Sequence, residues 1–212
     1  MQDSPILKRH GAYLPHWTRE NGIYHICFRL ADSASQKKLR QWKAAREDLQ
    51  QVAMQQKRPF TEWERKEWMR LHSEAIEQYL QKGRGSCWLR NTTIVEIVTG
   101  ALRFFEGTKF RLYAWCIMPN HVHVIMQPLG NYSVSSILHS WKTFSAKEAN
   151  KVLNRNGRFW HAEYFDKLIR SEEQLRICIR YVWDNPEKAG WSEWKWRWKI
   201  REDQLLDRNT GL

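Results

Sequence analysis

Two histidines separated by one residue are the feature of this chain that points most directly to chemistry. They are His121 and His123, in the run PNHVHVIMQ. Because side chains alternate across a β-strand, both imidazoles are expected to project from one face, about 7 Å apart. Two imidazoles at that spacing can bind one divalent cation, while the valines between and after them pack on the other side. The same pattern is also typical of polar residues on the solvated face of an amphipathic strand, so both interpretations stay open at this point.

The strand that carries these histidines is predicted to pair with the one before it. Residues 110–118 (FRLYAWCIM) and 121–127 (HVHVIMQ) are both rich in apolar, β-branched and aromatic residues. Only a Pro-Asn dipeptide separates them, so we expect a hairpin. An earlier strand is predicted over 23–30 (IYHICFRL), directly after an Asn-Gly turn signal.

Helices are predicted around these strands. Apolar residues recur at helical spacing over 91–106, and a second helix is predicted over 133–153. A third helix opens with a capping box and should end before a proline, over 171–185. The order of strand, helix, hairpin, helix and helix predicts an α+β fold with helices packed on an antiparallel sheet.

We expect a single domain over residues 1–212, in which residues 1–22 form an irregular arm. The segment 36–85 has a helix-favouring composition, with 12 basic and 7 acidic residues, and is interpreted as a helical insertion. It could grip DNA, form a dimerisation arm, or be a solvated helical pair. Residues 191–212 form a basic tail rich in tryptophan, in which alternating Trp and basic residues indicate a strand.

The composition limits the partners of the protein. Its 35 Lys and Arg residues exceed its 23 Asp and Glu residues, which gives a net charge of +12 and favours polyanions such as nucleic acid. No apolar run reaches the roughly 20 residues that a membrane-spanning helix needs. The four cysteines lie far apart, which argues against a disulfide framework or a zinc ribbon. We therefore expect a cytoplasmic protein, without a membrane partner, that binds nucleic acid.

Two longer stretches carry a family resemblance. The stretches AWCIMPNHVHVIMQP and FWHAEYFDKLIRSEEQLRICIRYVWDNPEKAGW resemble the single-tyrosine HUH transposases of the IS200-like superfamily, and most of all the REP-associated tyrosine transposases. The similarity runs from about Trp88 to Trp191, with a weaker echo over 24–32. It implies a ferredoxin-like or RRM-like antiparallel sheet with the HxH motif on a central strand.

The resemblance also implies a reaction. In this family Mg²⁺ or Mn²⁺ sits on the two histidines, here His121 and His123, and polarises a scissile phosphate. A tyrosine attacks and leaves a 5′-phosphotyrosine linkage and a free 3′-OH. The implied protein is a metal-dependent single-stranded DNA endonuclease and strand transferase that acts on palindromic, REP-like hairpins, as a monomer or homodimer. The alternative is a non-catalytic module of the same fold that binds single-stranded or hairpin nucleic acid.

The resemblance places the nucleophile at Tyr164, in the stretch FWHAEYFD. Tyr181 is the alternative, although its apolar neighbours favour a core position. Many relatives carry a Gln four residues after the tyrosine as a metal ligand, and that position is Leu168 here. Asp166 is therefore the expected third ligand, with His161 as another candidate, because a hard cation prefers carboxylate oxygen. A structural salt bridge explains Asp166 equally well.

Nucleic-acid contacts are expected from basic residues on several segments. The candidates are Lys142 and Lys147 on the middle helix, and Arg155 and Arg158 in the connection after it. Contacts of this kind position a nucleic-acid strand without reading its sequence. Trp160 could stack on an exposed base. A place in the core explains Trp160 equally well.

Overall fold

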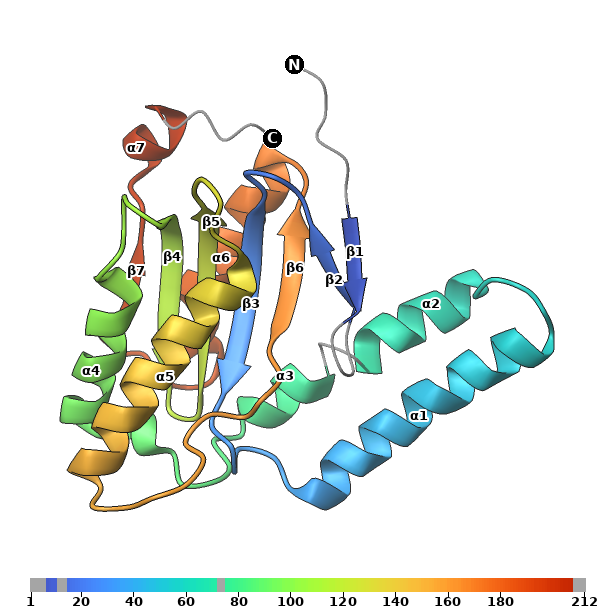
Figure 1. The fold of residues 1–212 in the computed structure, drawn as a ribbon, viewed down its shortest axis with the longest axis horizontal. Coiled ribbons are helices and arrows are strands. Elements are labelled where there is room, and N and C mark those ends of the chain that lie inside the picture. Colours follow the sequence, from blue (N-terminus) through green and yellow to red (C-terminus); the bar gives the residue numbers. More distant parts are fainter. Residues whose placement is uncertain (1–6, 11–14, 72–74, 208–212) are drawn as a thin grey trace. The chain divides into compact units, whose positions relative to one another are not determined.

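The computed structural model of the chain consists of two compact units (Figure 1). The first unit comprises residues 1–31 and 88–212, and the second comprises residues 32–87. The second unit therefore contains the segment whose composition predicts helices. The residues that the structure describes are 7–10, 15–71 and 75–207.

An antiparallel five-stranded sheet forms the centre of the first unit, with the order β6-β3-β5-β4-β7. Its strands are β3 (Ile23–Arg29), β4 (Phe110–Met118), β5 (His121–Pro128), β6 (Phe165–Ile169) and β7 (Arg197–Lys199). Strands β4 and β5 form the predicted hairpin, and β5 lies between β3 and β4. The histidine motif is therefore on a central strand, as the resemblance implies.

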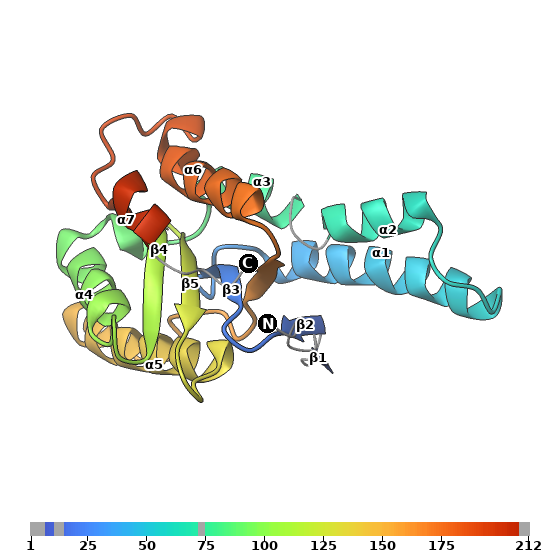
Figure 2. The ribbon, with the colours of Figure 1, turned by 90° about the horizontal axis from the view of Figure 1, so that it is seen from above.

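Helices cover both faces of this sheet. They are α4 (Thr92–Arg103), α5 (Val134–Val152), α6 (Glu172–Lys188) and α7 (Glu202–Asp207), with a short 3₁₀ helix, η2 (Trp88–Arg90), before α4. Figures 1 and 2 show α4 and α5 on one face of the sheet and α6 on the other. The succession β3, α4, β4, β5, α5, β6 is that of a ferredoxin-like fold, so the predicted α+β class is confirmed.

The two faces of the sheet bury two separate apolar clusters, because successive side chains of each strand point to opposite sides. One cluster joins the sheet to α4 and α5 and includes Phe28, Val122 and Val124. The other lies on the α6 side and includes Ile125 and Val182. The histidines alternate with the valines along β5 and therefore belong to the α6 side.

Three parts of the first unit differ from the sequence prediction. Within the predicted arm, β1 (Leu7–His10) and β2 (Pro15–Thr18) pair as an antiparallel hairpin, so an irregular arm is wrong for these residues; residues 1–6 and 11–14 lie outside the described residues. Strand β6 was not predicted. Helix α6 includes Pro186 and ends at Lys188, so its predicted end before the proline is wrong. Pro186 has no N–H to donate, and the helix ends two residues after it.

A buried hydrogen-bond chain fastens the segment before β6 to α5. The indole Nε1 of Trp160 donates to Oγ of Ser145 over 2.9 Å, and this hydroxyl donates to the carbonyl of Trp141 over 2.6 Å. Trp160 is only 3% exposed and contacts Phe28 in an edge-to-face arrangement. Trp160 is therefore a core residue, and the structure does not offer its ring as a stacking platform for a base.

We expect Ser145→Ala to lower the free energy of unfolding by about 1–3 kcal/mol, because it leaves the buried Trp160 indole N–H without its acceptor. In a Trp160→Phe background the same change should cost much less, since no donor remains. Urea unfolding of the four proteins measures this coupling. An equal cost of Ser145→Ala in both backgrounds would contradict the hydrogen bond as the cause.

The second unit is helical. Its helices are α1 (Gln36–Gln55), α2 (Glu62–Met69) and α3 (Ala75–Leu80). Thr61 and Glu64 form a capping box at the start of α2. Before it, the Arg58 guanidinium donates to both carboxylate oxygens of Glu64, over 2.6 and 2.9 Å.

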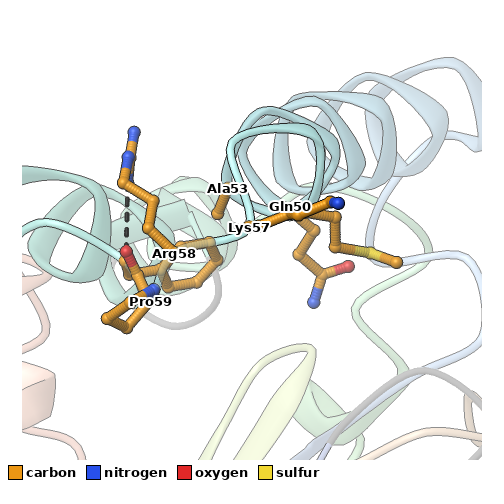
Figure 3. Close-up of a pocket in the computed structure, with 7 residues that line it drawn as sticks. Gln50, Ala53, Lys57, Arg58 and Pro59 are labelled. Atoms are coloured by element: carbon orange, nitrogen blue, oxygen red, sulfur yellow. Dashed lines mark hydrogen bonds between the residues drawn. The ribbon is translucent and has the colours of Figure 1, made fainter.

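A shallow cavity of about 540 Å³ lies at the connection between α1 and α2 (Figure 3). It is lined by Gln50, Ala53, Met54, Lys57, Arg58, Pro59 and Phe60. Figure 3 shows the Arg58 guanidinium donating to the carbonyl of Pro59, over 3.0 Å, beside this cavity. Arg58 thus hydrogen-bonds both the Pro59 carbonyl in the connection and Glu64 in the first turn of α2.

We expect the start of α2 to loosen in acid. The hydrogen bonds from Arg58, and then from the Thr61 backbone, lower the pKa of Glu64 from 4.5 to about 2. A carboxylate with a depressed pKa contributes stability above its unfolded pKa and loses it as the pH falls towards its folded pKa, here between about 4.5 and about 2. Amide-exchange protection of α2 should therefore fall across this window in the wild type and much less in Glu64→Gln. Glu62→Gln, at an exposed position of the same turn, is the control; an equally steep fall in Glu64→Gln would contradict this origin.

Candidate active site

The two histidines of the motif lie next to each other in the middle of the sheet. His121 and His123 are 0% and 1% exposed, and their ring centroids are 4.9 Å apart. In the antiparallel register His121 lies opposite Arg29 of β3, and His123 lies opposite Cys27. The solvated-strand interpretation of the motif is therefore wrong, because both imidazoles are buried between the sheet and α6.

Hydrogen bonds orient both rings. Nδ1 of His121 lies 2.7 Å from Oδ1 of Asn120, and Nδ1 of His123 lies 3.1 Å from Nε2 of His25. An amide oxygen only accepts, so Nδ1 of His121 carries the proton and its Nε2 holds a lone pair. That Nε2 atom is buried and has no hydrogen-bond partner among the described residues. The His121 ring thus presents the atom that can bind a metal.

The electrostatic environment keeps these imidazoles neutral. Burial lowers the pKa of His121 to about 3, and burial with a smaller effect of Lys167 lowers the pKa of His25 to about 4. The pKa of His123 lies well below 6.5, because of burial first and then the neighbouring His121 and His25. Neutral imidazole is the form that ligates a metal.

Helix α6 brings a tyrosine and an amide to the histidines. The Tyr181 ring meets His123 edge-on at a centroid distance of 5.9 Å and His25 at 5.8 Å. Asn185 follows one helical turn later, on the same side of α6. Its side chain is fully buried, and neither amide atom has a hydrogen-bond partner among the described residues. Asn185 is thus a second buried polar group at this face of the sheet that lacks a protein partner.

The structure does not bring Tyr164 and Asp166 to the histidines. Asp166 lies opposite Ile26 of β3, whose side chain is in the apolar cluster on the α4 and α5 side. Tyr164, two residues earlier, packs against that same cluster. Since alternate residues of a strand face opposite sides, both side chains are separated from His123 by the sheet itself. The expected third ligand and nucleophile are therefore not part of the histidine site in this conformation.

The residues expected to contact nucleic acid have different surroundings. Lys147 and Arg158 are exposed and Arg155 is half-buried, so these three side chains reach the surface. Lys142 is half-buried, and its ammonium donates to the carbonyls of His161 and Ala162, over 2.6 and 2.8 Å. Lys142 therefore also holds the backbone just before β6.

Sequence reasoning missed Asn185 and His25. The sequence pattern places Asn185 at the end of a helix, although a polar residue four positions after Tyr181 shares its helix face. His25 lies between Tyr24 and Ile26 in a predicted strand, so alternation places it on the face opposite to these two residues. Which face this is depends on the pairing of β3 with β5, and no local pattern shows it.

Part of the chain is similar to known proteins. Residues 84–185 match the family model described as Transposase IS200 like. The chain is 28% identical over 90 residues to the REP-associated tyrosine transposase of Escherichia coli, covering 40% of this chain and 52% of that protein. It is 29% identical over 98 residues to a Haemophilus influenzae protein provisionally given the same name, covering 42% and 56%. A solved structure of a REP-associated tyrosine transposase bound to a REP hairpin aligns with 96% of this chain and 87% of its own, at 16% identity and a TM-score of 0.47.

The chain spans about half the length of the curated relatives that it matches. The matched segment, residues 84–185, contains the histidine motif, Tyr181 and Asn185. In this segment the chain is similar to the IS200-like transposases, which confirms the resemblance in the sequence. None of the helices in the described part of the chain is long and apolar enough to cross a membrane.

Proposed function

We propose that this protein is a metal-dependent single-stranded DNA endonuclease and strand transferase that acts on palindromic, REP-like DNA hairpins. In this proposal Tyr181, rather than Tyr164, is the nucleophile. The observation that carries it is the contact of the Tyr181 ring with His123, on the face of the sheet where the histidine motif is buried. The matched IS200-like segment and the names of the relatives support the class of reaction and of DNA.

The donor atoms at this face fit a divalent cation. Buried polar atoms without hydrogen-bond partners are costly, and here they are Nε2 of His121 and the amide atoms of Asn185. Neutral imidazole and amide oxygen both ligate divalent metals, with Mn²⁺ the more tolerant of imidazole and Mg²⁺ favouring oxygen. No group of three His, Cys, Asp or Glu side chains within the described residues could hold a metal, so water or DNA oxygens would complete the site. The bound cation would act as a Lewis acid on the scissile phosphate and orient it.

The amide of Asn185 would be the third metal ligand. Many relatives place a Gln ligand four residues after the tyrosine, and Asn185 stands four residues after Tyr181. The proposed ligands are therefore His121, His123 and Asn185, in place of Asp166. Because Tyr181 and Asn185 occupy successive turns of one helix, α6 would position nucleophile and ligand together.

The phenol of Tyr181 carries out the proposed cleavage. Its oxygen attacks the phosphorus of the scissile phosphodiester, forming a tyrosine O–P bond while the bond between phosphorus and the 3′ oxygen breaks. The phenol proton is lost to solvent, and the departing 3′ oxygen takes up a proton. The phosphotyrosine bond keeps the phosphodiester linkage available for rejoining to another 3′-OH.

A covalent-trapping assay tests the nucleophile. Hairpin oligonucleotides from the DNA that flanks the gene are incubated with Mg²⁺ or Mn²⁺ and analysed on a denaturing gel. We expect a protein–DNA adduct with wild type and Tyr164→Phe and none with Tyr181→Phe, because the Tyr181 ring contacts His123 whereas Tyr164 packs on the other side of the sheet. An adduct with Tyr181→Phe but not with Tyr164→Phe would overturn the assignment. Hairpin binding without an adduct in any protein would favour the non-catalytic module.

Binding of Mn²⁺, followed by calorimetry, tests the ligands without any DNA. His121→Ala and Asn185→Ala should each weaken Mn²⁺ binding by about tenfold or more, because each removes one donor atom. Asp166→Asn is the matched control, since this side chain lies on the other face of the sheet. Weakened binding in Asp166→Asn with unchanged binding in Asn185→Ala would instead restore Asp166 as the third ligand.

A further inference from the structure

Arg29 is a buried guanidinium beside the histidine motif that the proposed reaction has not used. It ends β3 and lies opposite His121 in the register, and its side chain is 7% exposed. Its neighbour Phe28 belongs to the apolar cluster on the α4 and α5 side. By alternation Arg29 therefore faces the same side of the sheet as His121.

The segment before β6 adds His161 to Arg29. The backbone N–H of His161 donates to the carbonyl of Arg29 over 2.8 Å, so the two residues are paired across strands. Nδ1 of His161 accepts the backbone N–H of Glu163 over 3.2 Å. In the neutral ring the proton is then on Nε2, which makes that atom a hydrogen-bond donor.

The charges around this pair are predominantly positive. Burial first, and then Arg29, Lys142 and Arg158, lower the pKa of His161 to about 4, against the opposing effect of the hydrogen bond with the Glu163 backbone. Burial, Arg29 and Arg158 likewise bring the pKa of Lys142 down to about 8, against the opposing effect of Glu163. Three cations therefore act on one half-buried histidine. An anion placed among them would relieve their mutual repulsion.

We propose that Arg29 and His161 form a phosphate subsite, which binds the non-bridging oxygens of one DNA phosphodiester next to the histidine motif. A guanidinium offers several N–H donors in a planar fork that matches a phosphate group, and His161 adds one more. The ligand class, a DNA phosphodiester, rests on the proposed function. The subsite would hold the DNA strand in register with Tyr181 and the histidines.

The test asks whether the loss of a charge on the protein and the loss of a charge on the DNA have additive effects on affinity. The affinity is measured by equilibrium binding of the full chain to the flanking hairpin DNA. Tyr181→Phe is included in every protein, so that no cleavage occurs during the measurement. Each phosphate of the single-stranded part is replaced in turn by a neutral methylphosphonate. We expect Arg29→Gln to weaken binding of all-phosphate DNA by about tenfold or more. At one methylphosphonate position the same substitution should have almost no further effect, because the contacted charge is already gone.

Three more variants make the test decisive. Arg29→Lys retains the charge without the planar fork and should lie between wild type and Arg29→Gln. His161→Gln should couple to the same methylphosphonate position, and it decides the matter if Arg29→Gln does not fold. Arg103→Gln, at an exposed position at the end of α4, controls for the loss of one positive charge and should show no coupling.

Losses that are equal at every methylphosphonate position, or unchanged binding in Arg29→Gln and His161→Gln, would overturn the subsite. Coupling in the Tyr181→Phe background, together with no covalent adduct from the protein that retains Tyr181, would refute the proposed cleavage while keeping the subsite. An adduct from the protein that retains Tyr181, without coupling in the Tyr181→Phe background, would do the reverse.

Discussion

The burial of two neutral imidazoles in the middle of a sheet is the constraint on which the rest of the first unit depends. A buried polar group must be hydrogen-bonded or ligated, or it destabilises the fold. Asn120 in the hairpin turn and His25 on the adjacent strand bond the inner nitrogens of His121 and His123. That arrangement requires β5 to lie beside β3 and requires α6 to cover the pair. The same burial keeps the rings neutral and one edge of His121 available for a ligand.

The alternation of side chains along each strand places the largest apolar cluster and the histidines on opposite faces of the sheet. Side chains that point towards α4 and α5 form an apolar cluster, while those that point towards α6 include His25, His121 and His123. A shift of one residue along any strand therefore moves a side chain from the apolar side of the sheet to the histidine side, or the reverse. Tyr164 and Asp166 flank Phe165 by one residue on each side, and this single step places both on the apolar side.

Local patterns in the sequence were enough to predict the hairpin, the long helices and the histidine pair, because each depends on neighbouring residues. The pairing of β6 with β3 joins segments far apart in the chain, and β6 has only five residues with a mixed pattern, so it was missed. The choice between Tyr164 and Tyr181 depends on that pairing. The apolar neighbours of Tyr181 favour a core position, whereas its side chain is half-buried and contacts histidines as well as the apolar cluster.

The irregular segment between Trp160 and Phe165 places His161 on the side of the sheet that faces α6 and Tyr164 on the side that faces α4 and α5. Leu30 bridges Trp160 while Cys27 pairs with Phe165, so this strand carries two extra residues relative to β3. The extra length loops out, and the carbonyls it exposes are satisfied by the Lys142 ammonium from α5. Without that cation the carbonyls of His161 and Ala162 would lose a charged donor, and the segment before β6 would be held less firmly. Two of the three N–H donors of the Lys142 ammonium are thus used to hold the backbone just before β6.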